Sequence, residues 1–352
     1  MRTSLNWMPG GKLRVRNQIS IGVVVIAALL VSLEAIAGKS VEVQATQRAF
    51  SDSYRQGDWS RAIDLGLELV GLMPDHPVAQ YNLACIYALN GDRHQALHWL
   101  GLAAADGFLQ LAHFDADSDL DGVRDLPGYD NVRGAIVENH RRRRATILES
   151  AKASPPLILA PREYDPRNPA PLVIALHGYG DHGENYPELW GGAAGELGAI
   201  LAVPFGLRVV GKGRAWGDID ETETIVMLTL EQVQKRFEID AERIVLTGFS
   251  QGGFMAMALG TKHPDVFAGV IPMAGGYIPD IDAPPTANGE DPSFYFMVGS
   301  RDNAISQVRR AAADYNEAGY EVKLRVVAGT GHSFPRDTER ELSKALRFVL
   351  ER

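Results

Sequence analysis

Short apolar runs alternate with longer amphipathic segments over residues 155–352 of the chain. Continuous apolar runs of strand length occur at 172–176, 198–204, 243–247, 268–274 and 294–298, and an alternating run follows at 321–327. Helical patterns lie between them, near 186–197, 221–238, 251–262, 304–318 and 336–350. Strands that alternate with helices of this length form βαβ units. The pattern therefore predicts an α/β domain with a mostly parallel sheet, whose short buried strands explain the apolar runs.

Residues 45–140 follow a different, helical pattern with an internal repeat. The dipeptide Gly57-Asp58 recurs as Gly91-Asp92, thirty-four residues later, and Ala62-Ile63 recurs as Ala96-Leu97. Thirty-four residues is the tetratricopeptide period, and the segment resembles that family. Two repeats are few for an independent solenoid, because each repeat buries its face on a neighbour. We expect either a peptide-binding groove, and so a protein partner, or a helical bundle that serves as a rigid spacer.

The first 37 residues have the layout of a secretory signal. Four basic residues precede an apolar run of about fifteen residues, and Ala35-Ile36-Ala37 then offers a small-residue cleavage site. A spanning helix needs about twenty apolar residues, so a cleaved signal and an extracytoplasmic location are the prediction, with a retained membrane anchor as the alternative. A basic run, Arg141 to Arg144, lies in the segment 141–154, which we expect to link the two domains.

Net charge and cysteine content exclude some classes of partner and site. The formal net charge is −9, and loss of the signal leaves a net charge of about −12, which argues against nucleic acid as a partner. Cys85 is the single cysteine, so no intramolecular disulfide can form and a cysteine-based metal site is not expected.

A Gly-x-Ser-x-Gly motif centred on Ser250 carries the first sign of chemistry. It lies directly after the apolar run 243–247 and directly before a helix-like run. Where a strand turns sharply into a helix, Gly248 and Gly252 leave space that a Cβ would fill. Ser250 would then lie at the tip with its hydroxyl exposed, near the positive end of the helix. An incidental serine in a glycine-rich turn is the alternative, so partner groups decide between the two.

A base and an acid follow in the order that a hydrolase needs. His332 lies in a glycine-containing loop just beyond the run 321–327, and Asp302 lies about four residues beyond the run 294–298. An imidazole is required to take the serine proton, and a carboxylate holds that imidazole in the correct tautomer. The chain order Ser250, Asp302, His332 is that of an α/β-hydrolase. Three rival carboxylates lie in a proline-rich loop: Asp280, Asp282 and Asp291.

The run 172–176 leads into a glycine loop that could form an oxyanion hole. A tetrahedral intermediate needs two preorganised N–H donors, and we expect these to be the backbone amides of Gln251 and Tyr179. Gly178-Tyr179-Gly180 lacks the third glycine and the downstream acidic residue of a dinucleotide site, so a nucleotide is not expected.

With these elements in place, residues 155–352 resemble the carboxylesterase, phospholipase and thioesterase branch of the α/β-hydrolase superfamily. They are also similar to secreted polyester depolymerase-type and feruloyl-esterase-type enzymes. The segments that carry the resemblance are 176–181, 214–218, 243–253, 298–302 and 331–335. The resemblance implies an α/β-hydrolase fold with Ser250, Asp302 and His332 as the catalytic triad.

The resemblance also implies a position for Trp216. It would lie near the acyl or leaving-group side of the substrate pocket, and a buried packing role is the alternative. The loop 277–293 fits no part of the family pattern, so the shape of the pocket is not predicted.

The expected function is hydrolysis of small or polymeric carboxylic esters through an acyl-enzyme on Ser250. A peptidase of the same fold is one alternative, and a repeat-mediated binding or assembly protein with a vestigial site is another. No metal or organic cofactor is implied. Asp117, Asp119 and Asp121 copy the first half of a calcium loop, but Gly128 stands where the bidentate glutamate is needed.

Overall fold

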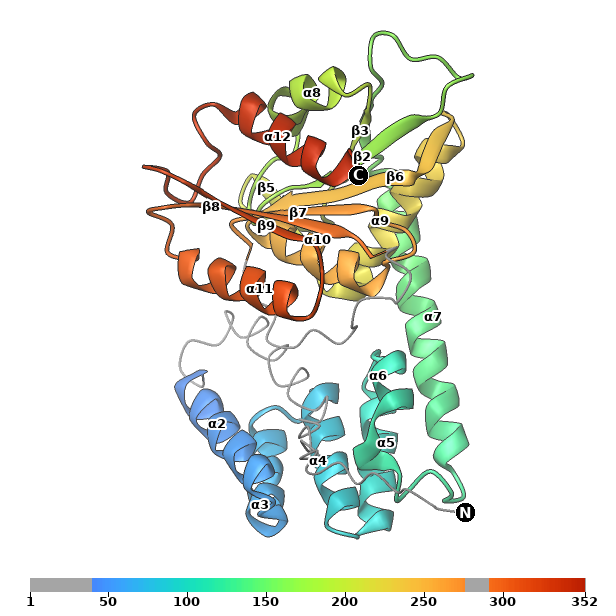
Figure 1. Cartoon of the computed structure of the whole chain (residues 1–352). Coiled ribbons are helices and arrows are strands. Elements are labelled where there is room, and N and C mark those ends of the chain that lie inside the picture. Colours follow the sequence, from blue (N-terminus) through green and yellow to red (C-terminus); the bar gives the residue numbers. More distant parts are fainter. Residues whose placement is uncertain (1–39, 276–290, 352) are drawn as a thin grey trace, which may run out of the picture. The chain divides into compact units, whose positions relative to one another are not determined.

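The computed structural model describes residues 40–275 and 291–351, which fall into two compact units divided between residues 143 and 144 (Figure 1). The predicted signal segment 1–37 and most of the loop 277–293 lie outside the described residues. Within the described ranges no helix combines the length and the apolar character needed to cross a membrane.

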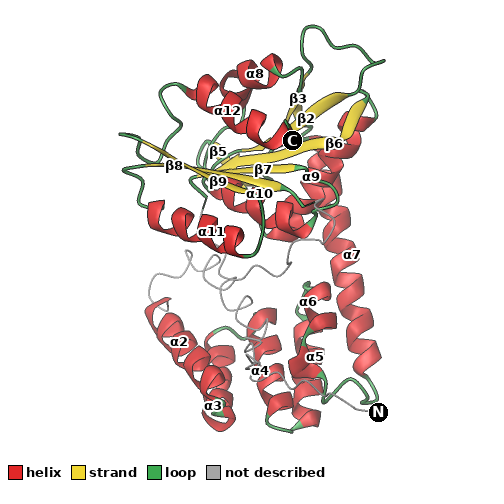
Figure 2. Cartoon of the chain, in the orientation of Figure 1, coloured by secondary structure: helices red, strands yellow, loops and turns green. Residues whose placement is uncertain are grey.

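The N-terminal unit is built from helices (Figure 2). In chain order they are α2 (Ser40–Gln56), α3 (Trp59–Leu72), α4 (Pro77–Leu89), α5 (Arg93–Ala105), α6 (Leu111–Ala116), the 3-10 turn η2 (Ser118–Leu120) and the first part of α7 (Tyr129–Ala153). The segment 141–154, which we expected to be a linker, is therefore mostly the C-terminal part of one continuous helix, α7.

The repeated Gly-Asp dipeptides start two helices in the same way. Asp58 caps α3 by accepting a hydrogen bond from Arg61 N, and Asp92 caps α5 by accepting one from Gln95 N. Each aspartate follows a glycine with positive φ, +70° at Gly57 and +86° at Gly91, a conformation that glycine adopts without strain. The sequence repeat is thus a structural repeat, and its tetratricopeptide character stays a prediction.

The C-terminal unit contains a seven-stranded sheet in the order β1-β3-β2-β6-β7-β8-β9, and only β1 runs antiparallel to its neighbour. These strands are β1 (Leu157–Leu159), β2 (Ala170–Leu176), β3 (Ile200–Val203), β6 (Ile239–Phe249), β7 (Gly269–Met273), β8 (Ser293–Gly299) and β9 (Val322–Val327). A separate hairpin pairs β4 (Arg208–Val210) with β5 (Gly213–Ala215). The helices are α8 (Tyr186–Glu196), α9 (Ile219–Gln234), α10 (Gln251–Lys262), α11 (Ile305–Glu317) and α12 (Thr338–Leu350).

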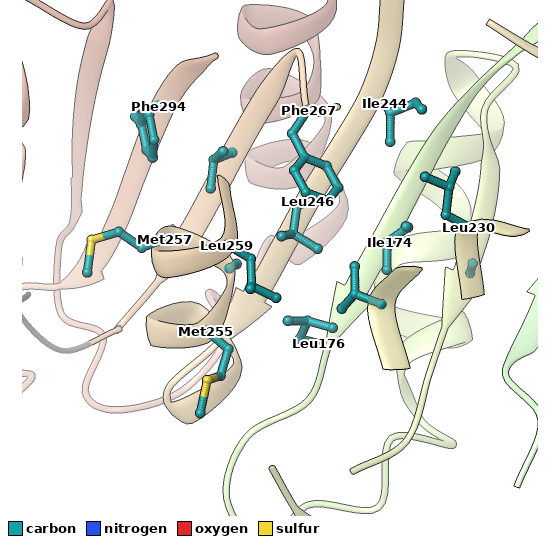
Figure 3. Close-up of a cluster of buried hydrophobic side chains, with 14 of the residues drawn as sticks. Ile174, Leu176, Leu230, Ile244, Leu246, Met255, Met257, Leu259, Phe267 and Phe294 are labelled. Atoms are coloured by element: carbon teal, nitrogen blue, oxygen red, sulfur yellow. The ribbon is translucent and has the colours of Figure 1, made fainter. Parts of the chain in front are cut away.

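Helices cover both faces of this sheet, which explains why its strands are apolar throughout (Figure 1). On β2, Ile174 and Leu176 belong to a core shared with α9, α10 and α11, part of which Figure 3 shows. The intervening residues Val173 and Ala175 belong to a second core shared with α8 and α12. The predicted α/β class and parallel sheet are confirmed.

Two elements differ from the prediction. The edge strand β1 and the hairpin β4–β5 are each only three residues long per strand and were not predicted. Strand β4 is largely exposed, with Val209 75% accessible, so it carries no buried apolar run that a pattern could reveal.

Candidate active site

Ser250 lies in a strained turn between β6 and α10. Its φ of 54° and ψ of −116° are unusual for a residue other than glycine, and its N–H donates to Met273 O at 2.8 Å. Cβ atoms on Gly248 and Gly252 would overlap the backbone of Gly252 and of Leu176 respectively. The backbone segments around Ser250 are therefore closely packed, and this packing keeps Ser250 in its strained conformation.

The structure brings the three predicted residues together. His332 Nε2 lies 2.9 Å from Ser250 Oγ, and His332 Nδ1 lies 2.9 Å from Asp302 Oδ2. The Asp302 side chain is 1% exposed, whereas that of His332 is 47% exposed. A buried carboxylate thus orients a histidine whose other nitrogen reaches a serine that solvent can approach.

Hydrogen bonds fix the segment that carries Asp302 and join it to the segment that carries His332. Asp302 Oδ1 accepts a hydrogen bond from Ala304 N at 2.8 Å, and Arg301 N donates to Thr330 O at 2.8 Å. The His332 ring also packs on Phe249, with ring centroids 5.0 Å apart. Of the rival carboxylates, Asp291 lies in the described part of the chain, where the carboxylate that contacts His332 Nδ1 is that of Asp302, and the other two lie outside the described residues.

The loop after β2 passes close to the turn that carries Ser250. A Cβ on Gly178 would meet the Phe249 ring at 3.3 Å and Ser250 Cβ at 3.6 Å. Tyr179, in the same loop, is 58% exposed to solvent. Gly178 N donates to the buried Tyr186 hydroxyl at 3.1 Å.

Trp216 does not line a pocket, contrary to the expectation of the sequence. The side chain is fully buried, its Nε1 donates to His177 O at 2.7 Å, and its ring stacks on the His177 ring at 4.7 Å between centroids. The Gln251 side chain meets the backbone of Trp216 twice, accepting from Trp216 N at 3.1 Å and donating to Trp216 O at 3.0 Å. Trp216 therefore packs behind the loop that follows β2, in the buried role that is the alternative for this residue.

Sequence reasoning assigned no role to His177 or Tyr186, which contact the same loop. His177 is fully buried, and burial lowers the pKa of its imidazole below the usual range. Burial raises the pKa of Tyr186 far above its usual value. The only sequence signal was the position of His177 between an apolar strand and Gly178.

One group of side chains in the N-terminal unit has the composition of a metal site. Ligand atoms of Cys85, Asp117 and Asp119, all buried, lie within 4.8 Å of one another. Hydrogen bonds already use both carboxylates, since Asp117 accepts from Tyr81 Oη at 2.6 Å and Asp119 accepts from Tyr54 Oη at 2.7 Å. These aspartates, from the partial calcium motif, thus tie the helices of the N-terminal unit together.

A doubly wound parallel sheet with a serine elbow, a following acid and a final histidine at the carboxyl ends of its strands defines an α/β-hydrolase. Residues 214–350 match the phospholipase/carboxylesterase family. The C-terminal unit therefore has an α/β-hydrolase fold, and most of it is similar to the phospholipase/carboxylesterase family.

Parts of the chain are also similar to individual curated proteins and to a solved structure. Over 117 residues the chain is 31% identical to poly(3-hydroxyalkanoate) depolymerase C of Paucimonas lemoignei, covering 30% of this chain and 28% of the relative. Over 146 residues it is 30% identical to feruloyl esterase C of Emericella nidulans, covering 39% of this chain and 50% of the relative. The chain thus spans half or less of the length of these curated relatives. Among solved structures, esterase PE8 has a TM-score of 0.45 at 21% identity, covering 56% of this chain and 99% of that one.

Proposed function

We propose that this protein hydrolyses carboxylic esters through an acyl-enzyme on Ser250. The hydrogen-bonded series from Ser250 Oγ through His332 to Asp302 Oδ2 is the single observation that carries the proposal. The match to the phospholipase/carboxylesterase family and the names of the relatives support ester chemistry in general.

The protonation of His332 follows from its two neighbours. A carboxylate only accepts hydrogen bonds, so Nδ1 carries the proton toward Asp302 and Nε2 is free to accept the proton of Ser250. Attack of Oγ on the ester carbonyl transfers that proton to Nε2 and forms a tetrahedral oxyanion. The backbone N–H groups of Tyr179 and Gln251 are the donors that we assign to this oxyanion.

Three further proton transfers complete the reaction. The imidazolium of His332 gives its proton to the alkoxide, so the alcohol leaves and Ser250 retains the acyl group. Water then attacks the acyl-enzyme while His332 takes a proton from the water, and on collapse His332 gives this proton to Ser250 Oγ as the acid is released. Asp302, buried beside Nδ1, stabilises the positive charge of the ring in both steps.

Kinetics on short p-nitrophenyl esters test this proposal. We expect turnover by the wild type, covalent labelling by a fluorophosphonate, and loss of both in Ser250→Ala, with turnover reduced by about 10⁶-fold. Thr224→Ala is a matched hydroxyl deletion on α9, where the Thr224 hydroxyl donates to Asp220 O of the same helix, and it should keep full activity. A wild type that is neither labelled nor active would overturn the proposal, and cleavage of peptides in place of esters would favour the peptidase alternative.

A further inference from the structure

We infer that His177 is a positioning residue that orients the oxyanion donor Tyr179 N–H through a fixed imidazole tautomer. This inference rests on the proposed function, because it concerns the same site. His177 touches no reacting atom, since it is fully buried behind the loop that passes Ser250. Its two ring nitrogens and its carbonyl oxygen each have a hydrogen-bond partner in the structure.

The neighbours of His177 leave one tautomer. His177 Nε2 lies 3.0 Å from the backbone N of Gly206, and a backbone N–H can only donate. Nε2 must therefore be unprotonated, so the single proton of the neutral ring is on Nδ1. Nδ1 lies 2.8 Å from Gly178 O, which can only accept, so both contacts require the same tautomer.

This tautomer fixes the orientation of one peptide group. The carbonyl of Gly178 belongs to the peptide that links Gly178 to Tyr179. In a planar trans peptide the C=O and N–H vectors point in opposite directions. Nδ1–H of His177 holds the carbonyl toward the protein interior, and the N–H of Tyr179 is thereby directed away from His177. The preceding peptide is held as well, because Gly178 N donates to the Tyr186 hydroxyl.

The imidazole is itself held from behind. The Trp216 indole stacks on the ring, and its Nε1 donates to His177 O. The segment that carries Trp216 is joined to the elbow by the paired hydrogen bonds of the Gln251 side chain. Gln251 thus has two connections to the oxyanion hole, one through its own backbone amide and one through this series of contacts.

Two substitutions of His177 each remove one of the two hydrogen bonds of the imidazole and can keep the other. In His177→Asn the amide nitrogen lies near the position of Nδ1 and can still donate to Gly178 O, whereas the contact with Gly206 is lost. In His177→Gln the longer side chain places its amide near the position of Nε2, so the contact with Gly206 can form and the donor to Gly178 O is lost. Both variants remove the ring, which makes them matched controls for loss of packing.

Steady-state kinetics on a p-nitrophenyl ester then test the inference. Removing one oxyanion donor typically lowers kcat by about 10²–10³-fold. We expect a loss of this order in kcat for His177→Gln with KM within about threefold, and a loss below about tenfold for His177→Asn. The inhibition constant of a trifluoromethyl ketone should rise in parallel with the loss in kcat/KM, because that ligand mimics the oxyanion. His263→Asn, a change at a histidine paired with Glu223, should match the wild type.

A spectroscopic measurement on the wild type does not depend on how the variants fold. Nitrogen-15 spectra of histidine-labelled protein should show a neutral Nδ1–H imidazole that does not titrate near pH 6.5, and its assignment to His177 follows from the loss of this signal in either variant. An Nε2–H tautomer for His177, or equal kcat losses in the Asn and Gln variants, would overturn the inference. Absence of any ester turnover in the wild type would instead overturn the proposed function itself.

Discussion

At the scale of single residues, Asp302 distinguishes a working triad from a chance contact. The carboxylate is buried, and Oδ2 faces His332 Nδ1 while Oδ1 caps Ala304 N. In Asp302→Asn we expect kcat for esters to fall by about 10⁴-fold, because an amide can hold the ring in the wrong tautomer. Asp337→Asn is the control, since Asp337 forms an exposed ion pair with Arg340. A loss below tenfold in Asp302→Asn would contradict the assignment of the acid.

Trp216 offers a second test at this scale. Trp216→Phe keeps a ring behind His177 but removes the Nε1 donor to His177 O, so we expect kcat to fall by about 10–100-fold with little change in KM. Trp190→Phe is a matched control, because Trp190 is also fully buried and its Nε1 has no hydrogen-bond partner within the described residues. Equal kcat values in the two variants would show that the indole N–H does not support the loop.

The site residues differ in how far the sequence could predict them. Ser250, Asp302 and His332 each follow a predicted strand, so the parallel sheet brings them to one edge. His177 and Trp216 act through backbone groups of segments that are distant in the sequence. No pattern along the chain shows which carbonyl or N–H a buried side chain will meet, so their positions required the structure.

At the scale of elements, close backbone approach defines the serine elbow. A Cβ on Gly252 would overlap the carbonyl groups of Leu176 and His177, so Gly252→Ala should displace the oxyanion loop. We expect a destabilisation of about 1–3 kcal/mol or more and a loss of kcat above about 100-fold. Gly191→Ala, in α8, meets nothing within 4 Å and should stabilise the protein by up to about 1 kcal/mol. Thermal melting and ester kinetics of the pair check this, and a fully active Gly252→Ala protein would contradict it.

Helices α9 and α10 are joined by an ionic contact that predicts a pH dependence. Burial disfavours the charge of Glu223, but hydrogen bonds from His263 and Lys262 outweigh burial and lower the pKa of Glu223 to about 2. A lowered pKa in the folded state adds stability above pH 4.5 that is lost as pH falls toward 2. Glu223→Gln should therefore be less stable at pH 7, and its unfolding free energy should fall less steeply between pH 5 and 2.

Chemical denaturation at several pH values measures this effect. Glu231→Gln is the control on the same helix, because Glu231 pairs with Lys235 in solvent and such pairs contribute little. Parallel stability curves for Glu223→Gln and the wild type between pH 5 and 2 would contradict the assignment.

Element prediction was accurate where burial leaves a pattern. Strands β2, β7 and β8 are buried at every position, and their apolar runs predicted them. The hairpin β4–β5 could not be predicted, since each strand has only three residues and β4 has no buried position. Asp117 and Asp119 copy a calcium motif in sequence, yet in the structure their carboxylates accept hydrogen bonds from tyrosines.

At the scale of the whole molecule, the apolar cores belong to separate units. The cores around Tyr81 and Leu100 and around Phe50 use residues of the N-terminal unit, whereas the two cores that flank the sheet use residues of the C-terminal unit. We therefore expect two calorimetric transitions, each responding to changes in its own unit.

Asp117→Ala tests this independence. It removes the acceptor of the buried Tyr81 hydroxyl, which should destabilise the N-terminal unit by about 1–3 kcal/mol and lower one transition. Turnover of esters at 25 °C should be unchanged. Asp125→Ala is the matched control. It breaks an ion pair between the exposed Asp125 and Arg93, and it should move neither transition. A shift of both transitions in Asp117→Ala would show that the units unfold together.

The proposed mechanism requires that Ser250 becomes acylated during turnover. Mass spectrometry of the protein quenched in acid within milliseconds of mixing with p-nitrophenyl acetate measures this directly. We expect a mass increase of one acetyl group, located on the peptide that contains Ser250 and absent in Ser250→Ala. Ester turnover with no acyl group on Ser250, or with the acyl group on another residue, would contradict it.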